Sequence, residues 1–559
     1  MKMRAAWKIW GILLLLLCLG ITAAQADSFN LSFSWDADGT ELSVRLYQQK
    51  KDYVLFLPGC APADSLTVTL QGRQEIRWKD AVIRSGDTVD LTADIGETVD
   101  VTDAGGARIA RVRVMRGSDI PALFFTFDQK DLKWTQEAYK HDITGNASVV
   151  MLNETGGTEC ADELTSFHVR GNTTRFGYKR PYQFKLKKKA PLFGMYEAKT
   201  WILLANWFDL SLIRNQITLN LCRELGLTGT PDSRQTDVYI NGVYNGTYLL
   251  VEKIQIKKGR LDLTDMEGAL EELNERPLSS YRRKVTWNRN GRSQKWFAFS
   301  REPEDITGGF LLEIEKEMQY NKNKENGGFV TQNGMYVNIK EPSQIGPLAA
   351  AYISGLVNDF DNALRARDGM NRKTGKRYSD YIDMQSFAAK LIVEELSANF
   401  DVNAASQFMY KDSDRVDPLL YAGPGWDYDF TYGNKDNGLH APLYNDYAYR
   451  KSSRSLYHLL LNHEDFSRLT RTVFETEAVP AVEILLGRRE PPAGSALQPL
   501  AQYIEDIRSS AEMNFTRWPA GIVLQLDPRS GKNFDDAAKY VVSWVEQRFD
   551  MMVREWRVQ

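Results

Sequence analysis

The pattern of apolar and polar positions divides the chain into a strand-rich first part and a helix-rich second part. Between residues 27 and about 118, short alternating runs are separated by Asp-Gly, Pro-Gly, Ser-Gly and Gly-Gly pairs, which favour turns. This spacing is typical of a small all-β sandwich of the immunoglobulin type. The runs contain no cluster of catalytic side chains, so we predict an accessory domain over residues 27–118.

Alternation continues beyond Ile120-Pro121, where a second domain is expected over residues 119–559. In the segment 182–186 the apolar residues lie on one face, and the opposite face carries Gln183 and Lys185. Residues 236–256 predict a hairpin with its turn at Asn241-Gly242. Residues 264–305 are polar and irregular, which indicates a surface insertion.

Helical periodicity dominates from residue 345 onward and ends with an amphipathic helix near the carboxyl terminus. A further helix is expected after Asp209 or Ser211, with Gly226 at its end. A β-rich half followed by a helical half predicts an α+β fold with two lobes.

Three acids stand out in the stretch 394–434, where a predicted helix breaks at Asn399 and a strand follows. Asp401 comes directly after the break, and GPGWDYDF carries Asp427 and Asp429. A buried unpaired carboxylate costs several kcal/mol, so acids among glycine and aromatic residues predict a cation. The pattern favours one carboxylate that accepts a proton and others that hold a hard divalent metal against phosphate. The alternative is that Asp401 caps a turn and the other two are solvated strand positions.

The first 26 residues have the features of a signal peptide. A basic start with Lys2, Arg4 and Lys8 precedes an apolar core, and Ala24-Gln25-Ala26 forms a cleavage site. No later stretch approaches 18 apolar residues, so we expect an exported protein, extracellular or in the cell envelope, without a transmembrane segment after cleavage.

Charge and cysteine content exclude several classes of protein. Removing three basic residues changes the formal net charge from −3 to −6, which argues against a nucleic-acid partner. Three cysteines remain after cleavage and lie far apart, so they indicate neither a disulfide framework nor a zinc site. The chain contains neither G-x-G-x-x-G nor a P-loop motif, and neither H-E-x-x-H nor G-x-S-x-G.

Several longer motifs resemble one family. RGNTTRFGYKRPYQFKL, LLANWFDLSLIRNQITLNLCRELGL, VYINGVYNGTYLLVEKI, GGFLLEIE, VNIKEP and GPGWDYDFTYGN occur in the order seen in the spore coat protein H (CotH) kinase family. The resemblance runs from about residue 120 to the carboxyl terminus and leaves out the predicted β-sandwich, which is similar to the accessory modules of cell-surface members.

The resemblance implies an atypical protein-kinase-like fold that binds ATP with Mg²⁺ or Mn²⁺ and phosphorylates Ser or Thr of exported proteins. It implies that Asp401 is the catalytic aspartate and that Asp427, with Asp429, is the metal ligand. The phosphate-binding lysine would be Lys185, with Lys179 as the less favoured choice. Arg170 and Asn172 would belong to the loop on the phosphate side. Independently of the resemblance, Glu252 in LLVEKI is a candidate for the anionic partner of the lysine at the nucleotide.

Other interpretations stay open at this point. Lys185 could be a solvated strand position, and Glu252 an exposed strand acid. Ser406 stands where a kinase loop carries the asparagine that is a second metal ligand. A different class of function is a catalytically inactive surface adhesion or structural protein that retains the fold, and the absence of nucleotide binding would favour it.

Overall fold

A computed structural model describes residues 29–287, 293–322, 327–402, 405–435, 455–520 and 528–556. The predicted signal peptide therefore lies outside the described residues. Within those ranges, no helix combines the length and apolar character needed to cross a membrane.

The chain forms two compact units. The first consists of the described residues up to Trp35 together with Ser43–Leu55 and Ala63–Val114. The second consists of Asp36–Leu42, Phe56–Pro62 and the chain from Met115 onward.

The strand-rich first part contains two sheets, with strand orders β2-β1-β5-β8 and β3-β4-β10-β9-β6-β7. The strands are β1 (Asn30–Ala37), β2 (Thr40–Arg45), β3 (Tyr47–Gln49), β4 (Asp52–Leu57), β5 (Leu66–Gln71), β6 (Glu75–Trp78), β7 (Ala81–Arg84), β8 (Thr88–Val89), β9 (Thr98–Thr102) and β10 (Arg108–Arg116). The immunoglobulin-like arrangement of these strands stays a prediction.

A closed seven-stranded barrel follows in the order β11-β12-β13-β14-β15-β17-β16. The strands are β11 (Ala122–Thr126), β12 (Ser148–Leu152), β13 (Thr158–Val169), β14 (Tyr182–Ala190), β15 (Ala198–Leu204), β16 (Ser233–Ile240) and β17 (Val243–Glu252). Aromatic and aliphatic side chains fill the interior, including Tyr182 and Phe184, whereas Lys185 is exposed. The predicted turn is confirmed, because Asn241 and Gly242 both have positive φ between β16 and β17.

A second large sheet has seven strands in the order β18-β19-β21-β22-β20-β23-β24. The strands are β18 (Arg283–Trp287), β19 (Ser293–Phe297), β20 (Phe310–Glu315), β21 (Gly328–Val330), β22 (Tyr336–Glu341), β23 (Gln407–Lys411) and β24 (Leu420–Ala422). The prediction of an irregular insertion over 264–305 is wrong, because β18, β19 and a helix lie within it. These two strands lie at one end of the sheet, where polar side chains obscure the strand pattern.

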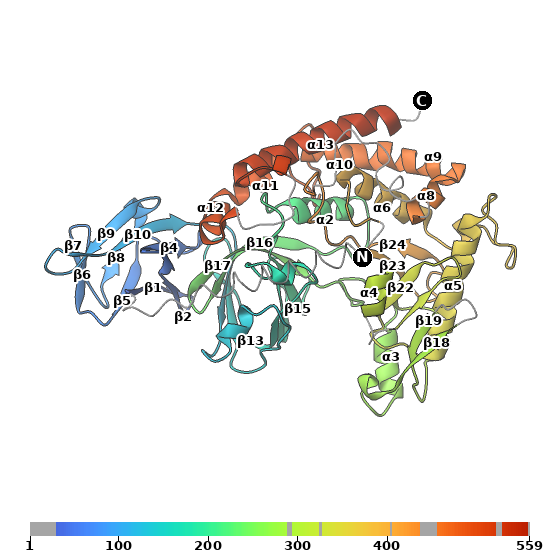
Figure 1. Cartoon of the computed structure of the whole chain (residues 1–559), viewed down its shortest axis with the longest axis horizontal. Coiled ribbons are helices and arrows are strands. Elements are labelled where there is room, and N and C mark those ends of the chain that lie inside the picture. The colour runs from blue at the N-terminus through green and yellow to red at the C-terminus, as the bar shows by residue number, and fades with distance from the viewer. Residues whose placement is uncertain are drawn as a thin grey trace, which may run out of the picture. The chain divides into compact units, whose positions relative to one another are not determined.

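Helices contact both sheets of the second unit (Figure 1). They are α2 (Arg214–Glu224), α3 (Met266–Leu273), α4 (Glu317–Lys322), α5 (Pro347–Arg365), α6 (Met384–Ser397), α8 (Leu456–Leu461), α9 (Glu464–Val473), α10 (Val479–Leu485), α11 (Leu500–Asp506), α12 (Arg508–Arg517) and α13 (Phe534–Trp556). Helix α6 contacts α2, α9 and α13. It is buried along nearly its whole length and ends at Ala398 in a left-handed conformation, so the chain turns sharply just before Asp401. The architecture is α+β, as predicted.

The three described cysteines are unpaired. Burial is the main cause that raises the pKa of Cys60 to about 12 and that of Cys222 to about 11. Cys160 is half-buried on β13.

Candidate active site

A cavity of about 520 Å³ brings together residues that are far apart in the sequence. One wall comes from the barrel and the loop before β14, and another from β20 and β22. The segments on either side of the β23–β24 pair complete it. The polar side chains at the cavity are those of Arg170, Asn172, Thr173, Thr174, Gln183, Asn206, Asn215, Lys253, Glu313, Glu315, Lys316, Gln319, Lys340, Glu341, Asp401, Ser406, Asp427 and Asp429.

The three predicted acids all lie at this cavity. Asp427 is open to solvent within it and has a φ of +68°, an uncommon conformation for a residue other than glycine. The Ser406 hydroxyl donates to Asp427 Oδ2 at 3.2 Å, and Ser406 also has a positive φ. Such backbone conformations persist where surrounding contacts enforce them, and they concentrate at functional sites.

Asp429 is held more deeply, with 8% of its surface exposed. The Asn215 amide donates to its Oδ1 at 2.5 Å. Burial raises the pKa of Asp429, and the charge on Asp427 raises it further. Although Asp427 is open to the cavity, the surrounding protein atoms still keep water from part of its carboxyl, and this desolvation is the main cause that raises its pKa, followed by the charge on Asp401. A cation beside these carboxylates would relieve both effects.

Buried polar contacts hold residues 427–429, the acid-bearing segment, in place. The Tyr428 backbone N–H donates to Asn215 Oδ1 at 2.8 Å, and the Tyr428 hydroxyl accepts from Lys390 Nζ at 2.8 Å. Lys390 is in turn paired with Glu394, and both are fully buried on α6. The segment is therefore anchored to α2 and α6.

Arg170, which the motif predicted at this site, lies close enough to the acids to interact with them electrostatically. Its guanidinium lies 5.4 Å from the centre of the Trp426 ring, and Asp427 and Asp429 both act on it electrostatically. Gly171 follows with a φ of +93°, and a Cβ there would lie 2.4 Å from Thr174 Oγ1. Only glycine fits this turn, which brings the exposed residue Asn172 to the rim.

Lys185 and Glu252 do not line the cavity. Lys185 is exposed on β14, and Gln183 from the same strand reaches the cavity instead. Glu252 is 7% exposed, accepts from the Asp232 backbone N–H at 3.0 Å and lies 3.9 Å from Arg260. Neither the predicted lysine nor its acid therefore lines this cavity, and the cation beside Glu252 is Arg260.

Lys179, the less favoured choice, is buried at 1% exposure. Its ammonium donates to the Thr247 carbonyl and lies 4.5 Å from the centre of the Tyr248 ring. Burial lowers its pKa to about 7, and Asp237 opposes that shift. Lys179 therefore belongs to the barrel and its packing.

Three lysines that the sequence reasoning missed do lie at the cavity, namely Lys253, Lys316 and Lys340. Lys340 Nζ pairs with Glu313 Oε2 at 2.8 Å, joining β22 to β20. Lys253 follows β17, where burial lowers its pKa and Glu341 counteracts the shift. Burial raises the pKa of Glu341 itself to about 7. The sequence could have indicated Lys253 and Lys340, since Lys253 in VEKI and Lys340 in VNIKEP each stand near the end of a predicted strand.

The donor set fits a hard divalent cation bound together with phosphate. Within the described ranges, no group of three or more His, Cys, Asp or Glu side chains is arranged to hold a metal ion. Mg²⁺ needs only one or two carboxylates when phosphate oxygens and water supply its other ligands. Asp427 and Asp429 provide those carboxylates, with Asp401 close enough to affect the pKa of both.

Acids, an arginine and three lysines line one cavity, and such side chains suit a phosphorylated ligand bound with a metal ion. A family model described as CotH kinase protein matches residues 167–552, which is more than half of the chain. The protein therefore belongs to the CotH kinase family. A comparison with curated proteins finds no match.

Proposed function

We propose that this protein is an exported kinase that transfers the γ-phosphate of ATP to Ser or Thr hydroxyls of other exported proteins. Membership of the CotH kinase family supports the class of reaction. The proposal rests on one observation: a single cavity is lined by Asp401, Asp427, Asp429 and Arg170.

Each side chain has a role in this proposal. Asp427 and Asp429 would hold Mg²⁺ or Mn²⁺, which would neutralise charge on the transferred phosphoryl group. Arg170 suits phosphate because its guanidinium offers a planar pair of donors, and Trp426 keeps that plane in place. Lys340 and Lys253 replace Lys185 as the lysines expected to contact phosphate.

Asp401 would act on the acceptor. Its carboxylate would accept the proton of the Ser or Thr hydroxyl while that oxygen forms its bond to the γ-phosphorus. The bond from the γ-phosphorus to the bridging oxygen breaks, and ADP leaves with the electron pair. Asp401 is half-buried at the cavity, where an acceptor side chain can reach it.

Transfer of label from γ-labelled ATP to candidate exported proteins tests the proposal. We expect incorporation at Ser or Thr with the wild-type chain and none with Asp427→Ala. Lys340→Ala should weaken ATP binding, whereas the matched variant Lys185→Ala should not, because Lys185 is exposed and away from the cavity. A wild-type chain that binds no nucleotide with either metal would instead support an inactive surface protein.

A further inference from the structure

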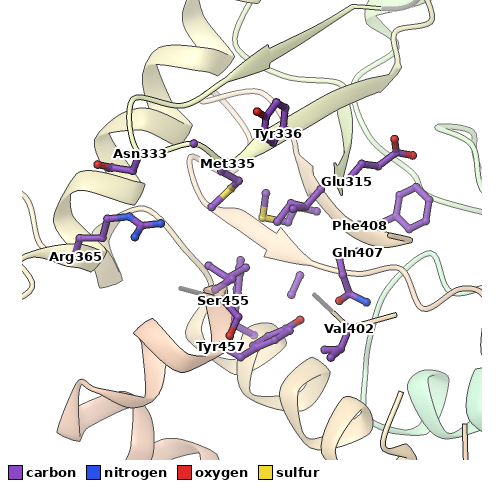
Figure 2. Close-up of a pocket in the computed structure, with 16 residues that line it drawn as sticks. Glu315, Asn333, Met335, Tyr336, Arg365, Val402, Gln407, Phe408, Ser455 and Tyr457 are labelled. Atoms are coloured by element: carbon purple, nitrogen blue, oxygen red, sulfur yellow. The ribbon is translucent and has the colours of Figure 1, made fainter. Parts of the chain in front are cut away.

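Figure 2 shows a second cavity, of about 360 Å³. It is lined by β20, β23, α6 and α8, and by the turn before β22. The two cavities share Glu315 and Phe408 among their lining residues. The second cavity therefore adjoins the candidate active site.

The alternation of side chains along β20 and β23 separates the two spaces. On β20, Glu313 lines the first cavity and Ile314 the second. On β23, Gln407 and Met409 both face the second cavity. Successive side chains of a strand point to opposite faces, so these strands form the wall between the cavities.

Gln407 is the unusual residue of this second cavity. It is 5% exposed, and within the described ranges neither atom of its side-chain amide has a hydrogen-bond partner. Figure 2 shows the amide directed toward the space between Val402 and Tyr457. Buried amides are nearly always hydrogen-bonded, because an unmet donor and acceptor cost free energy. An amide left open at a cavity is therefore available to a ligand.

The other walls favour an uncharged, flat molecule. Met335, Met409, Phe387 and Tyr457 supply polarizable and aromatic surface. The charge of Arg365 is offset by Asp361, with Nε to Oδ1 at 2.7 Å, and the acid Glu315 would repel an anion. The volume lies within the range of small-molecule pockets.

We propose that this cavity is a second binding site, for a small planar ligand that pairs a neighbouring donor and acceptor with the Gln407 amide. A carboxamide on an aromatic ring has such an edge, and so does adenine at N6 and N7. The site would exist whether or not the chain transfers phosphate.

Ligand-observed NMR on the whole protein tests this proposal with nicotinamide and adenine as probes. Their matched controls are 3-acetylpyridine and purine, which lack the amino donor. We expect at least one probe to bind saturably and to exceed its control. Binding of adenine alone would identify a nucleobase ligand, and binding of nicotinamide alone a carboxamide ligand.

Substitutions at the two cavities show at which of them the probe binds. Gln407→Leu should weaken it by about tenfold or more through loss of the paired hydrogen bonds. Gln183→Leu, a change at the first cavity, should leave it unaltered. Circular dichroism reports whether each variant is folded. If Gln407→Leu does not fold, Met335→Phe, which narrows the second cavity, takes its place with the same expected loss.

Three results would overturn the proposal. The first is no binding of either probe at millimolar concentration. The second is undiminished binding in a folded Gln407→Leu or Met335→Phe variant. The third is displacement of the probe by ATP with Mg²⁺, which would make the two cavities parts of one nucleotide site.

Discussion

Asn215 and Asp429 are joined by a 2.5 Å hydrogen bond from Nδ2 to Oδ1, although 214 positions separate them in the chain. The oxygen of the same amide accepts the backbone N–H of Tyr428. One side chain near the start of α2 therefore fixes both the backbone and a carboxylate of the acid-bearing segment. The geometry of the candidate metal ligands depends on α2 as much as on their own sequence.

Asn215→Ala should lower both stability and metal-dependent nucleotide affinity. The change leaves Asp429 buried without its donor, which costs about 1–3 kcal/mol in the free energy of unfolding. Urea unfolding and calorimetry with ATP and Mg²⁺ measure the two effects. The control is Asn220→Ala on the same helix, where the amide donates to the Tyr503 hydroxyl at 2.8 Å. That variant should lose stability alone, and equal loss of nucleotide affinity in both would contradict the positioning role.

Asp427→Ala should remove metal-dependent nucleotide binding while the fold remains. The carboxylate is open to the cavity and lies close to Asp401, so its loss deletes a ligand without emptying the core. Loss of even an outer-shell partner of a metal ligand typically costs roughly 10- to 100-fold in affinity, so we expect at least that. Calorimetry with Mg²⁺ or Mn²⁺ checks it, with exposed Asp262→Ala as the control. Unchanged affinity would take Asp427 out of the metal site.

Asp401→Asn should slow phosphate transfer without weakening nucleotide binding. Asparagine keeps the shape of the side chain and cannot accept the hydroxyl proton. Nucleotide and metal affinity should stay near the wild-type values, whereas transfer should fall by on the order of 10² to 10⁴. Single-turnover transfer at saturating ATP measures the effect. A variant with wild-type transfer would show that Asp401 is a turn residue.

Lys179 should make the stability of the protein depend on pH. Its pKa is about 7 in the folded state, against 10.5 for an ordinary lysine, because burial disfavours the ammonium. Below pH 7 both states carry the proton, and the full cost of burying it is present. Above pH 7 the unfolded state binds more protons, so stability rises with pH until the ordinary lysine pKa is reached.

Between pH 7 and 9 the wild-type chain should gain on the order of 2 kcal/mol in free energy of unfolding relative to Lys179→Met. Urea unfolding at the two pH values gives this difference. Lys185→Met, which alters an exposed lysine of β14, should keep the wild-type pH dependence. A pH dependence that is the same in Lys179→Met and the wild type would assign the effect to other groups.

The sequence predicted the features that depend on local pattern. Alternation identified the buried face of β14, and Asn241-Gly242 identified the hairpin turn, because each is decided by adjacent residues. The acids of the candidate site were found because glycine and aromatic neighbours surround them. Their catalytic and metal-binding roles stay predictions.

Features that depend on which strands meet across a cavity were not predicted. Lys340 has its partner on another strand, β20, and nothing near it in the sequence indicates that pairing. Lys185 was placed correctly on the outer face of β14, but Gln183 is the residue of that strand that reaches the cavity. Ser406 stands where a metal-binding asparagine was sought, and its hydroxyl donates to Asp427 instead.

The burial of Cys60 and Cys222 has a chemical consequence for handling this protein. A thiolate is the form that reacts with oxidants and alkylating reagents, and both of these groups hold their protons far above neutral pH. Burial raises the pKa of the Cys160 thiol as well, but this thiol is the more accessible of those described. A maleimide dye added to the folded protein should therefore label β13 first among the described cysteines, giving a single reporter position on the barrel.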